Sequence, residues 1–144
     1  MSKNTLLVTA IWCALAALIF YFADNIQNPN KLDNMGKSNH VVLKRGLDGH
    51  YRAQALINGE QVDVLVDTGA TGVAISQRIA DKLKLKSINA VRLQSVQIGG
   101  IQAHDVAAMI APSLDGDVLL GMSFLGRMDV RLYKGEMSIK QVAE

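Results

Sequence analysis

The sequence predicts one small domain built mainly from β-strands and preceded by one apolar helix. Short apolar runs alternate with Asn-Gly, Gly-Gly and Lys-Gly pairs in the second part of the chain, as is typical of β-hairpins. An uncharged apolar segment at residues 5–23 stands apart from these runs and predicts the helix. We therefore expect a closed β-barrel or β-sandwich that contains one short helix and follows a hydrophobic segment in the chain.

The apolar segment at residues 5–23 is long enough to cross a membrane. Nineteen helical residues span close to the roughly 30 Å hydrocarbon core of a bilayer. A cleaved signal peptide and a buried core helix are the alternatives, but residues 20–23 lack a small-x-small cleavage site and are rich in aromatic residues, which suit a membrane interface. We expect a tail at residues 1–4, an uncleaved single-pass anchor, and a domain that lies outside the cytoplasmic membrane.

A polar segment at residues 24–39 follows the anchor. It contains five Asn residues and has no apolar periodicity, so it predicts a flexible linker. Residues 40–144 then form the predicted folded domain, which is large enough for one small core. Tethering this domain to a membrane would raise its local concentration and favour self-association.

Three hairpins and one helix are expected in the domain. The helix should begin after Ser76, whose hydroxyl is suited to cap its first turn, and should extend over residues 77–83. A short strand at residues 73–75 precedes it. The hairpins pair residues 50–57 with 61–66, residues 91–98 with 101–110, and residues 129–133 with 136–140.

Asp67 is the candidate catalytic residue. It follows the apolar run of residues 62–66 and begins the sequence Asp-Thr-Gly. Peptide hydrolysis requires a general base and a general acid, and two carboxylates that share one proton supply both, because like charges close together cannot both ionise. The chain has one such triplet and no internal repeat, so a working site needs Asp67 from each chain of a homodimer. A surface turn with an ordinary solvated Asp is the alternative.

A second motif makes the pattern specific. Residues 118–121 read Val-Leu-Leu-Gly and precede a short segment around Ser123 that is expected to be helical. With residues 64–71, Val-Leu-Val-Asp-Thr-Gly-Ala-Thr, this motif resembles the retropepsin-like (retroviral-type) aspartic proteases of clan AA, in their bacterial membrane-anchored branch. The resemblance covers roughly residues 41–140.

The resemblance implies a role for each matching residue. It implies a homodimeric endopeptidase that acts on a peptide or protein substrate, with Asp67 as the catalytic residue. It also implies that the second motif supports the catalytic loop from behind. The implied supporting residues are Thr68, Gly69, Ala70, Thr71, Leu119, Leu120 and Gly121, and the implied substrate-binding residues are Val73, Ile75 and Ile110.

Other classes of function find little support in the sequence. The formal net charge is +2 and the chain has no basic cluster, so we expect no nucleic-acid partner. His40, His50 and His104 have no metal-ligand spacing, and the single cysteine, Cys13, lies in the apolar segment. We therefore expect neither a metal nor another cofactor.

One departure from the family concerns the flap, the hairpin that closes over a bound peptide. It should lie between Leu85 and Val91, where this chain has only residues 86–90. Either the Gly99-Gly100 hairpin serves as the flap, or the flap is missing. In the second case the chain is an impaired enzyme, and a dimeric peptide-binding or scaffold module is the alternative function.

Overall fold

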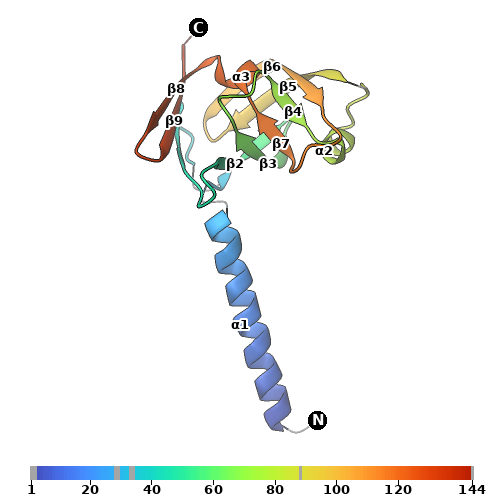
Figure 1. The fold of residues 1–144 in the computed structure, drawn as a ribbon, viewed down its shortest axis with the longest axis vertical. Helices are drawn as coiled ribbons and strands as arrows, with labels where there is room; N and C mark the ends of the chain where they lie inside the picture. The colour runs from blue at the N-terminus through green and yellow to red at the C-terminus, as the bar shows by residue number, and fades with distance from the viewer. Residues whose placement is uncertain (1–2, 28–29, 33–34, 88, 144) are drawn as a thin grey trace.

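The computed structural model describes residues 3–27, 30–32, 35–87 and 89–143. One long helix, α1, projects from a β-rich domain, and the C-terminal end of that domain lies far from the N-terminus of the helix (Figure 1). The predicted fold class is confirmed. Positions 1–2, 28–29, 33–34, 88 and 144, which belong in part to the predicted tail, linker and flap interval, lie outside the described residues.

Helix α1 extends over Lys3–Gln27. Its stretch Asn4–Ala23 is long and apolar enough to cross a membrane, and none of that stretch is buried against the domain. The buried core helix considered from the sequence is therefore wrong, whereas a membrane span and a signal sequence both fit. The helix is also longer than the predicted segment 5–23, because it continues through the first residues of the predicted linker.

Six strands close into a barrel in the order β2-β3-β7-β4-β6-β5. The predicted Asn58-Gly59 hairpin is confirmed: both residues have positive φ angles, 50° and 83°, as a type I′ turn requires. Alternate side chains of each strand fill the barrel interior. The strands are β2 (Tyr51–Ile57), β3 (Glu60–Val66), β4 (Val73–Ile75), β5 (Ala90–Ile98), β6 (Ile101–Ile110) and β7 (Val118–Leu120).

A three-stranded antiparallel sheet lies beside the barrel in the order β1-β9-β8. The predicted hairpin corresponds to β8 (Met128–Tyr133) and β9 (Glu136–Gln141). Strand β1 (His40–Lys44) was not predicted, and it pairs with β9 so that His40 lies opposite Lys140. The side chains of Leu43 and Ile139 are fully buried and join this sheet to the barrel core.

Two short helices complete the domain, and both lie where the sequence predicted a helix, although the predicted fold class named only one. Helix α2 (Gln77–Lys82) begins at the predicted cap, where the hydroxyl of Ser76 accepts a hydrogen bond from the amide of Ile79. Helix α3 (Met122–Leu125) begins after Gly121 and buries Phe124 and Leu125.

The described part of the predicted linker is bound to the domain rather than free. Asn30 is only 4% exposed. Its side-chain amide donates hydrogen bonds to the carbonyls of Lys44 and Arg52, at 2.9 and 2.7 Å, and its side-chain oxygen accepts one from the amide of Lys44 at 2.8 Å. Asn30 thus holds the ends of β1 and β2 together, as a buried amide must find partners. The flexible linker predicted from the sequence is wrong at this position.

Residues 35–38 cover the turn between β5 and β6. Met35 packs against the core. A Cβ atom on Gly99 would lie 3.1 Å from the Cβ of Met35, and one on Gly100 would clash with the carbonyl oxygen of Ser38. We call residues 30–32 and 35–39 together the strap, because they run along the domain surface from Asn30 to the start of β1.

Candidate active site

The two sequence motifs meet because β7 lies between β3 and β4. Strand β7 runs parallel to β3, with Leu119 opposite Leu65, and antiparallel to β4, with Leu119 opposite Ala74. The segment that leaves β3 at Asp67 and returns as β4 must therefore pass over the end of β7. The fold, more than the local sequence, places the second motif directly behind the candidate catalytic loop.

The loop of residues 67–72 holds Asp67 at the surface. The amide of Asp67 donates a hydrogen bond to the carbonyl of Leu120 at 3.1 Å. One carboxylate oxygen of Asp67 accepts a hydrogen bond from the amide of Gly69 at 2.8 Å. Asp67, Thr68 and Gly69 are all exposed. The loop therefore presents an oriented carboxylate outward from the end of β3, a strand with one buried face.

Gly121 lets the second motif approach the loop closely. A Cβ atom at this position would clash with the carbonyl oxygen of Gly72 and would lie 2.7 Å from that of Ala70. The next amide, that of Met122, donates a hydrogen bond to the carbonyl of Ala70 at 2.8 Å. Only glycine fits here, because any side chain would push the loop away from its support.

Ser123 provides a further support that the motif analysis did not single out. Its hydroxyl accepts a hydrogen bond from the amide of Val73 at 3.0 Å and donates one to the carbonyl of Ala107 at 2.7 Å. The serine thereby joins the end of the loop to β6. The signal in the sequence was its position two residues after Gly121, but the partners lie 50 and 16 residues away and only the fold reveals them.

The predicted substrate-binding residues lie in the core. Val73 and Ile75 are fully buried, and Ile110 is 7% exposed. All three pack inside the barrel, where they have almost no surface to offer a peptide in this conformation. Among the other predicted residues, Leu120 and Gly121 are buried, Ala70 and Leu119 are partly buried, and Thr71 is exposed.

The flap has no counterpart among the described residues between α2 and β5. Residues 83–87 and 89 contain no strand, and the amide of Leu85 donates a hydrogen bond to the carbonyl of Ala80. Ile88, within the predicted short interval, lies outside the described residues. The alternative flap, the Gly99-Gly100 turn, is covered by Met35 and Ser38 and is not free to close over a site.

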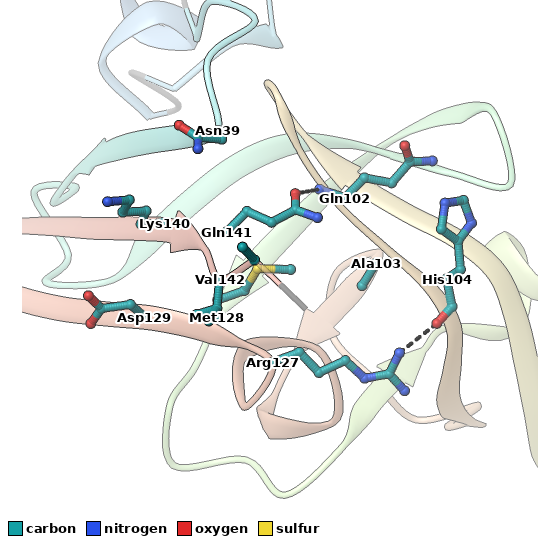
Figure 2. Close-up of a pocket in the computed structure, with 11 residues that line it drawn as sticks. Asn39, Gln102, Ala103, His104, Arg127, Met128, Asp129, Lys140, Gln141 and Val142 are labelled. Carbon is teal, nitrogen blue, oxygen red and sulfur yellow. Dashed lines mark hydrogen bonds between the residues drawn. The ribbon is translucent and has the colours of Figure 1, made fainter.

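A pocket of about 810 Å³ lies between β6 and the three-stranded sheet (Figure 2). Gln141 accepts a hydrogen bond from the amide of Gln102, and Arg127 donates to the carbonyl of His104. These side chains satisfy backbone groups at the edge of β6. None of the residues that line the pocket belongs to the candidate catalytic loop. Within the described ranges, no three His, Cys, Asp or Glu side chains are grouped to hold a metal ion.

The site geometry agrees with a family match. The family model described as aspartyl protease matches residues 53–124, half of the chain, and includes both motifs. The chain belongs to the aspartyl protease family.

A solved structure shows which fold this member of the family adopts. A retropepsin-like aspartic protease from Rickettsia conorii superposes with a TM-score of 0.65 and 27% sequence identity, and the match covers 71% of this chain and 90% of that one. The protein is retropepsin-like, as the sequence motifs predicted.

Two curated relatives are themselves uncharacterised. A protein in the cobV 5′ region of Sinorhizobium sp. is 33% identical over 109 residues, which cover 62% of this chain and 46% of the relative. A protein of Rickettsia prowazekii is 28% identical over 102 residues, which cover 64% of this chain and 41% of the relative. The chain spans less than half the length of either relative.

Proposed function

We propose that the protein is a membrane-anchored aspartic endopeptidase whose active site forms between two copies of the chain. The observation that carries the proposal is an exposed carboxylate, Asp67, at the end of β3, on a loop held by Leu120 and Gly121. One such loop per chain supplies half of a dyad, and a two-fold axis beside Asp67 would supply the other half.

The proposed mechanism uses the pair of Asp67 carboxyl groups as one unit. In the free enzyme they share one proton, so one is ionised and one is neutral. The ionised group takes a proton from water, whose oxygen attacks the peptide carbonyl carbon, while the neutral group protonates the carbonyl oxygen. The resulting tetrahedral diol then collapses: the C–N bond breaks, the nitrogen gains a proton, and an acid and an amine leave.

The backbone around Asp67 supports this role. The amide of Gly69 already donates to one carboxylate oxygen, which fixes the orientation of the group before substrate binds. Thr68 is exposed beside it and is proposed, with Gly69, Ala70 and Thr71, to shape the loop at the dimer axis. Leu119, Leu120 and Gly121 are proposed to hold that loop in place from behind.

Helix α1 is proposed to be an uncleaved anchor in a bacterial cytoplasmic membrane, with the domain on the outer side. The domain organisation proposed with it is a tail (1–4), an anchor (5–23), a connecting segment (24–39) and a protease domain (40–144). Confinement to a surface favours the dimer, because it raises the effective concentration of one copy around another.

Cleavage of a diverse peptide library tests this proposal. The full-length chain in nanodiscs is incubated with the library from acidic to neutral pH beside Asp67→Asn, and products are identified by mass spectrometry. Asp115→Asn serves as a matched control, because Asp115 is an exposed acid on a different loop. Cleavage by the parent and the control but not by Asp67→Asn supports the protease. No cleavage by a preparation shown to be dimeric contradicts it.

A second candidate function is a dimeric peptide-binding or scaffold module. The short connection between α2 and β5 favours it, since the described residues there offer nothing to close over a peptide. In that case peptides captured from the library would remain intact, and Asp67→Asn would bind them as well as the parent does.

A further inference from the structure

The strap fixes the end of the domain that lies nearest the anchor. Asn30 is hydrogen-bonded to Lys44 at the end of β1 and to Arg52 near the start of β2. The loop that joins these strands, residues 45–50, is therefore held next to Asn30. In Figure 1 this loop lies beside the C-terminal end of α1.

Chain length sets how far this end can lie from the bilayer. The candidate span ends at Ala23 and α1 ends at Gln27. Four helical residues rise about 6 Å, and the three residues that reach Asn30 add at most about 10 Å. With the span in a membrane, Asn30 stays within roughly 16 Å of the hydrocarbon edge, a distance comparable to the headgroup region and its first hydration layers.

Exposed apolar side chains gather at this same end. Leu47, at the tip of the β1–β2 loop, is 90% exposed, and Tyr133, at the end of β8, is 71% exposed. The two loops are neighbours, because the amide of Arg45 donates a hydrogen bond to the carbonyl of Gly135 at 3.0 Å. Leucine and tyrosine at loop tips suit a lipid headgroup boundary, where an apolar body and a polar tip are both accommodated.

The charge of these two loops is complementary to an anionic surface. Residues 44–52 and 131–136 together contain five basic and two acidic side chains. Arg52 is paired with Asp48, and Arg131 with Asp129 just outside these ranges. The excess positive charge therefore comes from Lys44, Arg45 and Lys134, beside Glu136, which is exposed opposite Lys44 in the sheet. Lys134 lies over the ring of Tyr133, 5.2 Å from its centre. Basic side chains beside aromatic and aliphatic ones are typical of surfaces that bind anionic lipids.

We propose that Lys44, Arg45, Leu47, Tyr133 and Lys134 form a membrane-facing patch that docks the domain onto anionic phospholipid headgroups of the bilayer crossed by α1. This inference rests on the membrane anchoring in the proposed function and adds a second, peripheral contact. The anchor limits the distance between the domain and the bilayer. The basic side chains attract the headgroups, and Leu47 and Tyr133 enter the boundary between headgroups and acyl chains.

Docking would also hold the candidate catalytic loop near the membrane surface. Tyr51 follows the β1–β2 loop directly and lies opposite Val66, the residue before Asp67. Asp67 therefore lies at the same end of the β2–β3 hairpin as the β1–β2 loop. The substrates that this arrangement favours are extended polypeptide segments near the membrane surface, such as the flanks of membrane-spanning helices, rather than loops far from the bilayer.

Fluorescence quenching in nanodiscs tests the proposal on the full-length chain. Cys13→Ser removes the native thiol, and Leu47→Cys then carries an environment-sensitive fluorophore. Gln61→Cys, exposed at the other end of the β2–β3 hairpin, is the matched control, because the hairpin separates the two positions by about 20 Å. Nanodiscs contain phosphatidylcholine alone or phosphatidylcholine with phosphatidylglycerol, and headgroup-labelled nitroxide lipids serve as the quencher.

Trp12, the single tryptophan, reports on the anchor in the same samples. It lies within the candidate span, so a quencher in the acyl chains should reduce its emission when α1 is inserted. We expect Trp12 to be quenched in both lipid mixtures and the position-47 label to be quenched strongly only with the anionic lipid. The label at position 61 should remain unquenched.

Charge reversal provides an independent measurement. Each basic side chain near an anionic surface contributes about fivefold to the docking equilibrium. The triple variant Lys44→Glu, Arg45→Glu and Lys134→Glu should therefore abolish quenching at position 47 and leave Trp12 unchanged. Arg45 donates a hydrogen bond to the carbonyl of Gly49, and Lys44 lies opposite Glu136, so β-sheet circular dichroism is recorded to verify that the triple variant is folded.

The outcomes separate the two proposals. Quenching of Trp12 without quenching at position 47 overturns the membrane-facing patch and leaves the anchored protease standing. Absence of Trp12 quenching overturns the anchor, and the patch with it. A position-47 label that is shielded equally in both lipid mixtures, and only in discs that hold two copies, would show that a second copy covers Leu47 and would overturn lipid docking.

Discussion

The amide of Asp67 donates its hydrogen bond to the carbonyl of Leu120, 53 positions further along the chain, at 3.1 Å. This contact joins the two sequence motifs, because the acid that begins the loop is tied to the strand that supports it. The neighbouring residue Gly121 continues the support by touching the carbonyls of Ala70 and Gly72. The end of β7 therefore contacts the candidate catalytic loop at Asp67, Ala70 and Gly72.

Asp67→Asn should act in a dominant-negative manner. If each site needs both Asp67 carboxyls, mixing equal amounts of parent and variant should leave about half of the parent activity, because half of the parent chains pair with an inactive partner. Peptide cleavage at a constant amount of parent, with increasing variant, measures this. Activity that stays constant as the variant is added would argue against a shared site.

Gly121→Ala should destabilise the domain and lower any cleavage activity. The new methyl group would overlap the carbonyl oxygens of Ala70 and Gly72, and such overpacking costs about 1–3 kcal/mol or more. Urea denaturation gives the free energy of unfolding. Gly72→Ala is the control, since a Cβ there meets nothing within 4 Å, and the prediction fails if both variants unfold alike.

Ser123→Ala should weaken the link between the loop and β6. The change leaves the amide of Val73 and the carbonyl of Ala107 without their hydroxyl partner, which costs about 1–3 kcal/mol. We expect a lower kcat with little change in KM, because the loop geometry is affected more than the peptide contacts. Ser123→Thr, which keeps the hydroxyl, should retain much of the parent kcat. An equal loss with threonine would contradict a role of the hydroxyl.

Asn30→Ala should release the strap from the barrel. It removes three hydrogen bonds from a side chain in a site that is almost fully buried, at a cost of about 1–3 kcal/mol. Amide exchange at Lys44 should become faster, and limited proteolysis should begin within residues 30–39. Asn39→Ala, at an exposed position of the same segment, provides the comparison. Equal protection of both variants against amide exchange and proteolysis would contradict the role of Asn30 in holding the strap.

The Asp48–Arg52 pair should give a measurable titration in the β1–β2 loop. The side-chain hydrogen bond from Arg52 lowers the pKa of Asp48 below its ordinary value of 3.8. A lowered pKa means that this contribution to stability is present above pH 3.8 and is lost as the pH falls through the pKa of the folded state. NMR titration should show the Asp48 pKa returning toward 3.8 in Arg52→Gln. No change would show that the pair does not form in solution.

The motifs and the hairpins could be predicted because each depends on local residues. Asn58-Gly59 specifies its turn through positive φ angles, and Ser76 caps α2 with its own hydroxyl. The Asp67 loop was likewise found from adjacent residues. Only the fold, however, could show that Ser123 supports it, since the partners of that hydroxyl come from two other strands.

The other differences between the predicted and the observed structure come from contacts between distant parts of the chain. Asn30 lies in a polar, Asn-rich stretch that is typical of linkers, and its burial depends on Lys44 and Arg52. Strand β1 has only five residues and gains its partner near residue 140. Val73 and Ile75 lie on either side of the small residue Ala74 in β4, but such alternation alone does not distinguish the barrel interior from a binding surface.

The pairing of β1 with β9 determines when folding can finish. His40 lies opposite Lys140, so the first strand of the domain can pair only after a segment about a hundred residues later has been made. Until residues 136–141 have been synthesised, β1 is an open edge and Leu43 lacks part of its cover. A polypeptide that is truncated before that point would therefore expose an unpaired strand edge, which favours aggregation.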